Sequence, residues 1–384
     1  MWQICYNRDM SGKEIRAYYS RIEEPRYEGF VEHKLADILI LVQCAVMCGL
    51  DKLEEIEEYG KEKREWLKKV FGIERIPSDS TLSRVLSLLN PDIVVNCVVE
   101  MMKEALGISG EQIALDGKTI CATATEATRQ EKLHIVTMYM VENGVILGQK
   151  AVPKKTNELP VVRELLEMFT LAGKVVTADA MHCNRETIEK IIQRGGDYVL
   201  ALKGNQEIAH NEIGAYIEDC IADPLVEMEM ASTVEKNRNR IETRVCYKAP
   251  SLSWFESIHE WTDLKSAYAI KRSTVGQGGK QTLETAYFIS SLDVSPSRIL
   301  SIVPSHWKIE SLHWMLDVDY GEDGCRLLSA SGHQIMNILR KNAIAFHQSF
   351  IASMPQKTKP SAKKHMLRSL INNDSLLHLL RFSL

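Results

Sequence analysis

The chain is 384 residues long, which leaves room for two or three domains with a sizeable core. Hydrophobic residues make up 45% and charged residues 26%, as is typical of a soluble globular protein. The charges of the 47 basic and 51 acidic residues nearly cancel, so the protein as a whole has no strong positive potential that would attract a polyanionic partner. Any nucleic-acid surface must therefore be local.

The cysteines and the apolar runs indicate the cellular compartment of the protein. Nine cysteines are scattered without a Cys-x-x-Cys pair, which is typical of reduced thiols in a cytoplasmic protein. The N-terminus lacks a basic region followed by an apolar core, so we expect no secretory signal. The most apolar run, residues 38–50, contains Gln43 and is too short for a bilayer. We expect a buried helix there and no membrane association.

Residues 30–106 are expected to be helical. Apolar residues recur there at steps of three and four, namely Leu35, Ile38, Leu39, Val42 and Val46. The alternating charges of residues 51–75 favour a solvated helix face. Residues 77–84 predict a turn followed by a capped helix start. That helix either forms the second half of a DNA-contacting helix-turn-helix or only packs, and the sequence leaves both open.

The pattern changes from helix to strand near residue 111. Expected strands lie at 113–115, 133–142, 145–152, 174–178 and 198–202, and expected helices at 160–171 and 185–194. Asn143-Gly144 between the second and third strands is a strong hairpin signal. The order predicts a mixed sheet covered by helices, with parallel right-handed crossovers in its second half.

Two of these strands are each followed by an aspartate, Asp116 and Asp179. In open α/β sheets, functional sites gather at the carboxyl ends of strands. A carboxylate at such an edge needs a neutralising partner. For Asp116 either a divalent metal or the nearby Lys118 suits that role.

Residues 204–283 predict a β-rich insertion into the sheet domain. An amphipathic stretch runs to residue 221, strand-like runs lie at 243–247 and 266–270, and a glycine-rich turn lies at 276–279. Residues 284–292 resume a strand, and a helix is expected to begin near Pro304.

The helix expected at residues 305–316 carries one stripe of titratable side chains. His306, Glu310, His313 and Asp317 fall within about 60° of each other around the helix axis, and most of the other positions are apolar. This predicts a buried helix that faces a polar site, where a metal or a compensating charge offsets the cost of burial. An internal His–Glu network is the alternative.

After a further helix at 335–350, five basic residues follow, namely Lys357, Lys359, Lys363, Lys364 and Arg368. They form a solvated linker or contact DNA phosphates.

Two strand-end aspartates and a helical glutamate are hard oxygen ligands, which suit Mg²⁺ or Mn²⁺. Two such ions about 4 Å apart activate an attacking oxygen and stabilise the leaving one in phosphodiester chemistry. The expected fold is therefore α/β, a ribonuclease-H-like mixed sheet flanked by helices, in a nucleic-acid enzyme.

The sequence also resembles the DDE transposases of the H-repeat-associated (ISAs-type) insertion-sequence family over nearly the whole chain. The matching runs, in chain order, lie at residues 33–39, 44–49, 77–84, 115–119, 156–159, 177–181, 197–206, 306–310, 312–318 and 321–323. Some positions depart from the family pattern. Arg238-Asn239-Arg240-Ile241-Glu242 replaces His-Gly-Arg-Ile-Glu, Pro304 replaces an Arg, and Asn184 replaces a Gln.

The resemblance implies that Asp116, Asp179 and Glu310 are the catalytic acids and hold two Mg²⁺ or Mn²⁺ ions. It changes the expected role of Lys118 to a DNA-phosphate contact. The other candidate DNA contacts are Lys203, Asn205, Arg240, His306, Lys308 and His313. The implied domains are a helical, DNA-binding domain at 1–108, a catalytic domain at 109–350 interrupted by the insertion at about 206–283, and a basic tail with a terminal helix at 351–384.

The predicted function is a transposase that cuts the ends of its insertion sequence and joins them to target DNA. Because two DNA ends must be held together, we expect a homodimer, in the bacterial cytoplasm at the nucleoid. A metal-dependent nuclease without strand transfer and a non-catalytic DNA-binding remnant are alternatives. A zinc hydrolase using His306, Glu310 and His313 is disfavoured, because zinc motifs on one helix usually pair His at i and i+4.

Overall fold

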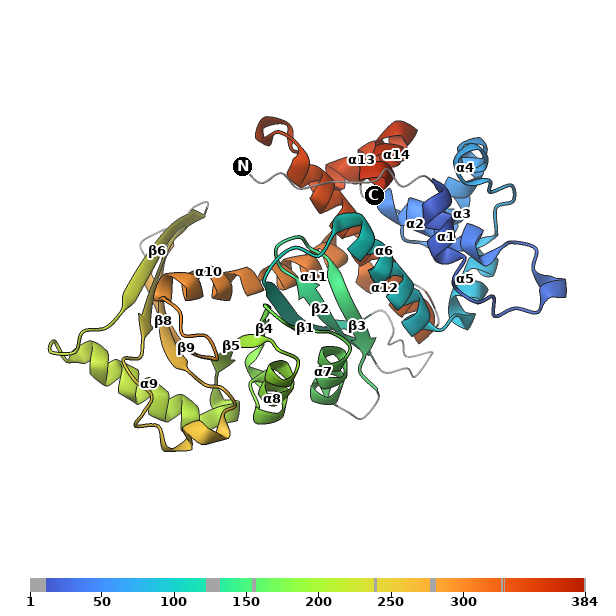
Figure 1. Cartoon of the computed structure of the whole chain (residues 1–384). Coiled ribbons are helices and arrows are strands. Elements are labelled where there is room, and N and C mark those ends of the chain that lie inside the picture. The colour runs from blue at the N-terminus through green and yellow to red at the C-terminus, as the bar shows by residue number, and fades with distance from the viewer. Residues whose placement is uncertain are drawn as a thin grey trace. The chain divides into compact units, whose positions relative to one another are not determined.

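The computed structural model describes residues 12–121, 132–153, 157–237, 240–276, 281–325, 327 and 329–382 (Figure 1). The chain forms two compact units. Unit 1 contains Met1–Ser109, Gly117–Thr156 and Glu310–Leu384, and unit 2 contains Gly110–Asp116 and Asn157–Ile309. The three-domain division expected from the sequence stays a prediction.

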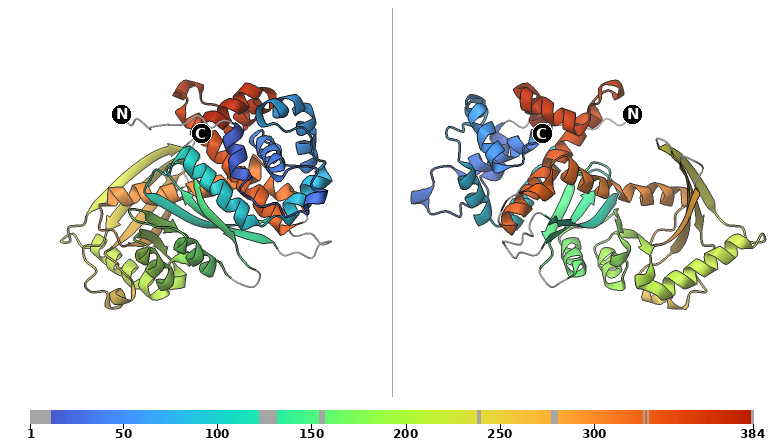
Figure 2. Two further views of the ribbon diagram at one scale, coloured as in Figure 1. Left: turned by 45° about the vertical axis from the view of Figure 1, so that its right-hand side comes forward. Right: turned by 180° about the vertical axis from the view of Figure 1, so that it is seen from behind.

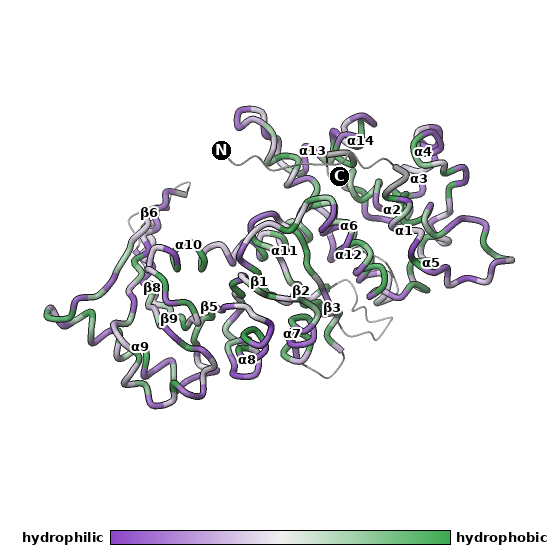
Figure 3. The backbone as a smooth tube through the Cα atoms, viewed as in Figure 1, coloured by the Kyte–Doolittle hydropathy of each residue, from purple (hydrophilic) through white to green (hydrophobic). Residues whose placement is uncertain are grey.

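The first part of unit 1 is helical, as expected. Its helices are α1 (Gly12–Tyr19), α2 (Leu35–Met47), α3 (Leu53–Glu62), α4 (Arg64–Phe71), α5 (Asp79–Leu88) and α6 (Pro91–Leu106). Nearly every residue of α2 is buried, which explains its continuous apolar run. Hydrophilic and hydrophobic residues alternate along α4, whose Leu67 and Phe71 are buried (Figure 3). The side chain of Ser78 accepts from the N–H of Thr81 and so caps α5.

The long helix α12 (Ala330–Ser353) organises unit 1. It packs against α2, α5, α6 and strand β3 (Ile146–Ala151), and all of its residues from Ile335 to His347 are buried. Residues 351–384, expected as a basic tail with one helix, contain two helices, α13 (Ala362–Ile371) and α14 (Asn373–Phe382). Both contact α12, so this segment is part of the fold.

The expected hairpin is confirmed. Strand β2 (Leu133–Met140) pairs antiparallel with β3, and Tyr139 lies opposite Ile146. Gly144 in the connection has φ 73°, in the left-handed region where glycine is favoured.

Unit 2 contains the parallel strands. Strands β4 (Val175–Ala178) and β5 (Asp197–Leu202) pair in parallel, and β4 also pairs in parallel with the first part of β1 (Gln112–Ile120). Helices α7 (Glu158–Glu167) and α8 (Arg185–Gln193) make the connections and contact each other. The expected alternation of strand and helix is therefore confirmed.

The expected β-rich segment extends the same sheet. Strands β6 (Met230–Asn237), β7 (Arg240–Lys248), β8 (Ser266–Val275) and β9 (Gln281–Ser290) form an antiparallel meander, and β9 pairs with β5. The strand order is β3-β2-β1-β4-β5-β9-β8-β7-β6. The mixed α/β class is confirmed, and the ribonuclease-H-like assignment stays a prediction. Residues 238–239 and 277–280, the latter in the expected glycine-rich turn, lie outside the described residues.

Helices α9 (Glu207–Ala222) and α10 (Pro296–His306) cover opposite faces of this meander (Figures 1 and 2). On one face, Lys271 of β8 pairs with Glu218 of α9 at 2.7 Å. On the other, the neighbouring Ile270 packs with Ile299 and Leu300 of α10 in an apolar cluster. Successive strand residues point to opposite faces, so one strand serves both helices.

The expectation of one buried helix beginning near Pro304 is wrong. Helix α10 begins at Pro296, and proline is well tolerated in the first turn of a helix. Pro304 lies inside this helix. The helix ends at His306, and α11 (Lys308–Val318) starts after a one-residue break at Trp307. Nor is this segment fully buried, because Trp307 is 54% and Trp314 58% exposed.

Across the described residues, no single helix has both the length and the apolarity to cross a membrane. The pair formed by α5 and α6 meets that test only jointly, and the two helices are bent by 96°.

Two buried histidines join the C-terminal helices to α2. The Nε2 of His347 donates to the carbonyl of Met47 at 2.8 Å, so its Nδ1 accepts from the Nδ1–H of His365 at 2.7 Å. Burial, reinforced by the neighbouring His365, lowers the pKa of His347 to about 3, and burial also lowers the pKa of His365. Both rings are therefore neutral in the folded protein at ordinary pH.

This pair predicts acid sensitivity. Below the unfolded-state pKa of 6.5, His347 is protonated in the unfolded chain but stays neutral in the folded chain until the pH approaches 3. The free energy of unfolding therefore falls as the pH falls through this range. From pH 7 to pH 5 the loss is about 2 kcal/mol for this residue. We expect His347→Gln, whose amide can still donate to Met47, to show a shallower pH dependence of its urea midpoint. Equal slopes for both proteins would contradict this.

Candidate active site

The two aspartates follow neighbouring residues of paired strands. Leu115 of β1 lies opposite Ala178 of β4 in the parallel register, and Asp116 and Asp179 come directly after them. Adjacent strands lie about 4.8 Å apart, so both carboxylates start from the same edge region of unit 2. Asp116 is half-buried and Asp179 exposed.

Asp116 does not end its strand as expected. Strand β1 continues to Ile120, and Lys118 and Ile120 are buried. The apolar run stops at Leu115 because the second half of the strand consists of Asp116, Gly117, Lys118 and Thr119 before Ile120, although Lys118 and Ile120 are buried.

The turn after Asp179 is held by hydrogen bonds. The side-chain amide of Asn205 donates to the carbonyls of Ala180 at 2.7 Å and Cys183 at 3.4 Å. The buried ring of His182 contacts the carboxylate of Glu158 through Nε2 at 3.1 Å, and since a carboxylate accepts, Nε2–H donates. Asn205, predicted as a DNA contact, thus uses its amide within the protein.

Asn184, which departs from the family pattern, has a clear structural role. Its side chain accepts from the N–H of Thr187 at 3.0 Å and caps α8. The sequence analysis missed Glu158 and His182 as partners. Only the matching run at 156–159 pointed to Glu158, and Thr156 itself lies outside the described residues.

His306 is also engaged within unit 2. Its Nδ1 lies 3.0 Å from the hydroxyl of the buried Thr177. The amide of Gln112 donates to that same hydroxyl at 3.1 Å and to the carbonyl of Ile302 at 2.9 Å. These contacts fix the end of α10 to β1 and β4, so His306 has a role in packing that the DNA-contact prediction did not include.

Glu310 lies exposed on α11, with the exposed Lys308 and the half-buried His313 on the same helix. It is the first residue of its stretch of unit 1, whereas Asp116 and Asp179 belong to unit 2. Within the described stretches, no group of three or more His, Cys, Asp or Glu side chains is spaced to hold a metal ion. The assembly of the three acids into one site stays a prediction.

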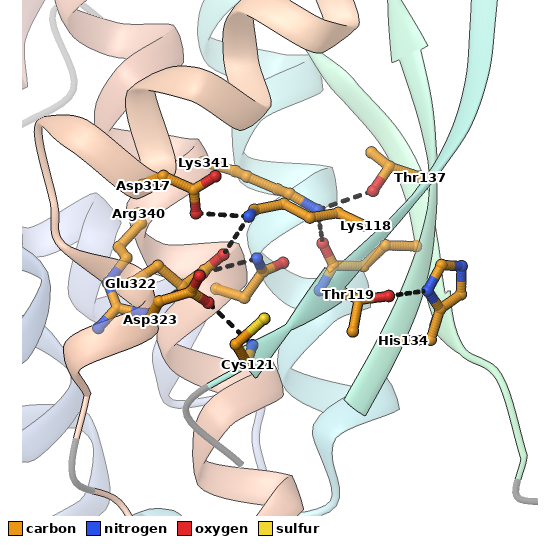
Figure 4. Close-up of polar contacts among 12 residues, drawn as sticks. Lys118, Thr119, Cys121, His134, Thr137, Asp317, Glu322, Asp323, Arg340 and Lys341 are labelled. Atoms are coloured by element: carbon orange, nitrogen blue, oxygen red, sulfur yellow. Dashed lines mark hydrogen bonds and ion pairs between the residues drawn. The ribbon is translucent and has the colours of Figure 1, made fainter. Parts of the chain in front are cut away.

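The prediction that Lys118 contacts DNA does not fit its surroundings. Only 9% of its side chain is exposed, and its ammonium lies 2.5 Å from Asp317 and 3.8 Å from Glu322 (Figure 4). A phosphate cannot reach a buried ammonium that is already paired. Lys203 and Arg240, by contrast, are exposed, so their DNA contacts stay predictions.

These pairs belong to a larger group of charges in unit 1, which we call the ion cluster; Lys118, Glu322 and Arg340 are buried, Asp51 is half-buried and Asp317 is exposed. It consists of Asp51, Lys118, Asp317, Glu322 and Arg340. Arg340 lies 3.3 Å from Glu322 and 3.5 Å from Asp51, and the amide of Asn337 donates to Glu322 at 2.8 Å. Arg340 and Glu322 are completely buried.

Burial and pairing act in opposite directions on these groups. Burial works against the charge of Arg340, but the nearby Glu322, Cys325 and Asp51 outweigh it and raise its pKa. Burial raises the pKa of Asp51, and Arg340 offsets part of that effect. Sequence analysis missed the cluster, although the matching run at 321–323 includes Glu322.

Comparisons with known proteins place the chain in a family. A model described as "Transposase DDE domain" matches residues 109–346, and one described as "DDE_Tnp_1-associated" matches residues 16–102. The "Putative transposase YncI" of Escherichia coli O157:H7 is 36% identical over 346 residues, 87% of each chain. The "H repeat-associated putative transposase YhhI" of Escherichia coli K12 is 30% identical over 385 residues, 96% of this chain and 100% of the relative.

Among solved structures, a piggyBac transposase synaptic complex with hairpin DNA is similar at a TM-score of 0.46 and 12% identity. The alignment covers 98% of this chain and 83% of the piggyBac chain, but similarity at this level does not assign a fold.

The mixed sheet and the matched domain define a transposase of the DDE class. The chain belongs to the H-repeat-associated members of that family, as its motifs predicted. Transposition of a mobile DNA element is therefore the process in which the family acts, and its members generally use divalent metal ions.

The contact between Glu158 and His182 predicts a stability effect. We expect Glu158→Ala to lower the free energy of unfolding by about 1–3 kcal/mol, because it leaves a buried donor without its acceptor. Glu189→Ala, an exposed position on α8, is the control and should stay within about 0.5 kcal/mol of the parent. Urea unfolding measures both, and equal effects would show that the contact contributes nothing specific.

Proposed function

We propose that the protein is a transposase that cuts the ends of its insertion sequence and transfers them to target DNA. Asp116, Asp179 and Glu310 are the proposed catalytic acids. The observation that carries this proposal is the parallel register of β1 and β4, which brings the first two acids onto neighbouring strands within the matched DDE domain. The third acid rests on the motif at 306–310.

The proposed cofactor is a pair of Mg²⁺ or Mn²⁺ ions. The donor set fits, because it consists of three carboxylates, at least two of which are exposed. When bound, such ions supply charge neutralisation and activation of the attacking oxygen. The residues of this chain hold the ions and orient them, and the turn after Asp179, tied by Asn205 and His182, limits the freedom of one acid.

The proposed fold of the catalytic part is ribonuclease-H-like. Its support is the run of strands from the β2–β3 hairpin through β1 to the parallel β4 and β5, with α7 and α8 as connections. The meander β6–β9 then enlarges the sheet between the second and third acids along the chain.

DNA is the proposed partner, both as element ends and as target. The proposed phosphate contacts are three exposed cations. Lys203 directly follows β5, Arg240 begins β7 of the meander, and Lys308 begins α11, which carries Glu310. We also propose a homodimer on DNA, since two ends are joined, and a place at the nucleoid in the cytoplasm.

A metal-dependent nuclease without strand transfer is the second candidate, because the same acids serve both reactions. A zinc hydrolase using His306, Glu310 and His313 has less support than before. The Nδ1 of His306 already contacts Thr177, and α10 and α11 are separate helices, so the three residues do not share one helix.

One assay tests the proposed function. Purified protein is incubated with labelled element ends, a target plasmid and Mg²⁺, and cleaved and joined products are separated. We expect Asp116→Asn, Asp179→Asn and Glu310→Gln each to lower the cleavage rate at least about 100-fold, since even changes at partners of metal ligands cost 10–100-fold.

Glu207→Gln, an exposed carboxylate at the start of α9, is the matched control and should cleave at the parental rate. Cleavage without joining by the parent would favour the nuclease, and DNA binding alone would favour a non-catalytic remnant. Full cleavage by Asp116→Asn would show that the assignment of the acids is wrong.

A further inference from the structure

We propose that Lys118 and Asp317 are positioning residues: their ion pair, backed by Glu322 and Arg340, sets the orientation of α11 and hence of Glu310. This inference rests on the proposed function, because it concerns one of the three proposed acids. Neither residue is one of the three proposed acids, and neither is among the exposed cations proposed above as phosphate contacts.

The spacing along the two elements links the ion pair to the acids. Lys118 follows Asp116 by two residues on β1, so the two side chains leave the strand on the same side. Asp317 follows Glu310 by seven residues on α11, which is two helical turns and nearly the same face. The ion pair therefore joins the strand that bears one acid to the helix that bears another.

The pairing is directional. The ammonium of Lys118 lies 2.5 Å from Oδ1 of Asp317 and 3.8 Å from Oε2 of Glu322. The other oxygen of Glu322, Oε1, accepts from Asn337 and Arg340. Glu322 thus connects Lys118 to α12, and Figure 4 shows the lysine between the two carboxylates. Rotation or sliding of α11 would break the contact with Asp317.

Stability alone does not explain such an arrangement. Removing charges from water is costly, and a buried ion pair replaced by well-packed apolar residues often leaves stability unchanged or improved. What an apolar contact lacks is a fixed direction, because it tolerates small rotations of a helix. A cation held between two carboxylates fixes both the height and the rotation of the helix.

Asp317 lies at the open end of the cluster, where 42% of its side chain is exposed, whereas Glu322 and Arg340 are fully buried. Its charge is therefore the one that can be removed with the least disturbance of the fold. Asp317→Asn keeps the shape and an acceptor oxygen but weakens the hold on Lys118. Lys118→Met removes the charge from the other side, and Lys118→Arg keeps it.

The test measures Mn²⁺ binding to the full-length protein by electron paramagnetic resonance of the free ion, with the Mn²⁺ concentration for half-maximal cleavage as a second readout. We expect Asp317→Asn and Lys118→Met to weaken Mn²⁺ binding about 10- to 100-fold, as loss of a partner that orients a ligand does. Lys118→Arg should restore most of it.

The matched control is Glu167→Gln. Glu167 pairs with Lys190 at 2.6 Å on the surface of α7 and α8, so this variant also removes one carboxylate charge from an ion pair. It should bind Mn²⁺ like the parent. Urea midpoints of all variants separate positioning from unfolding, and if Lys118→Met does not fold, Asp317→Asn decides alone.

Parental Mn²⁺ binding by a folded Asp317→Asn would overturn the inference. Asp116→Asn distinguishes this from failure of the proposed function. If Asp116→Asn abolishes Mn²⁺ binding while Asp317→Asn does not change it, only the positioning role is wrong. If Asp116→Asn also binds like the parent, the proposed metal site itself is wrong.

Discussion

The parallel pairing of β1 with β4 is the constraint on which the candidate site depends. Parallel strands require a crossover connection, so residues far apart in the chain are brought to the same edge of the sheet. The register then decides which side chains become neighbours. Because Leu115 lies opposite Ala178, the residues that follow them, Asp116 and Asp179, leave neighbouring points of the sheet. A shift of one residue would direct one carboxylate to the other face.

The same strand also serves unit 1. Beyond Asp116, β1 supplies Lys118 to the ion cluster, where the lysine meets carboxylates from α11 and from the turn at Glu322. Burying these charges is expensive, and the cluster offsets that cost by giving each charge an opposite neighbour. Polar groups next to α10 are also paired, since the hydroxyl of Thr177 contacts both the amide of Gln112 and the Nδ1 of His306. The regions next to the proposed acids are thus fixed by polar contacts, which have direction.

The elements that the sequence predicted well are those with strong local signals. The hairpin at Asn143-Gly144, the apolar helix α2 and the strand before Asp179 were confirmed because turn chemistry and hydrophobic periodicity are local properties. The helix at Pro304 was misplaced because two prolines, Pro296 and Pro304, offered the same signal for a helix start. The ion partners of Lys118 were missed for a different reason: nothing near it in the sequence reveals that Asp317 and Glu322 surround it.

The sequence by itself determined the family and the mixed α/β class, and its motifs led to the proposal of the three acids, because motifs and periodic patterns are local features of the chain. Only the tertiary structure decided which polar side chains form hydrogen bonds or ion pairs within the protein. Lys118, Asn205 and His306 all have side chains suited to DNA, yet each makes contacts with residues distant in the sequence. A side chain's partners depend on which elements pack together, and that is fixed by the register of strands and the placement of helices.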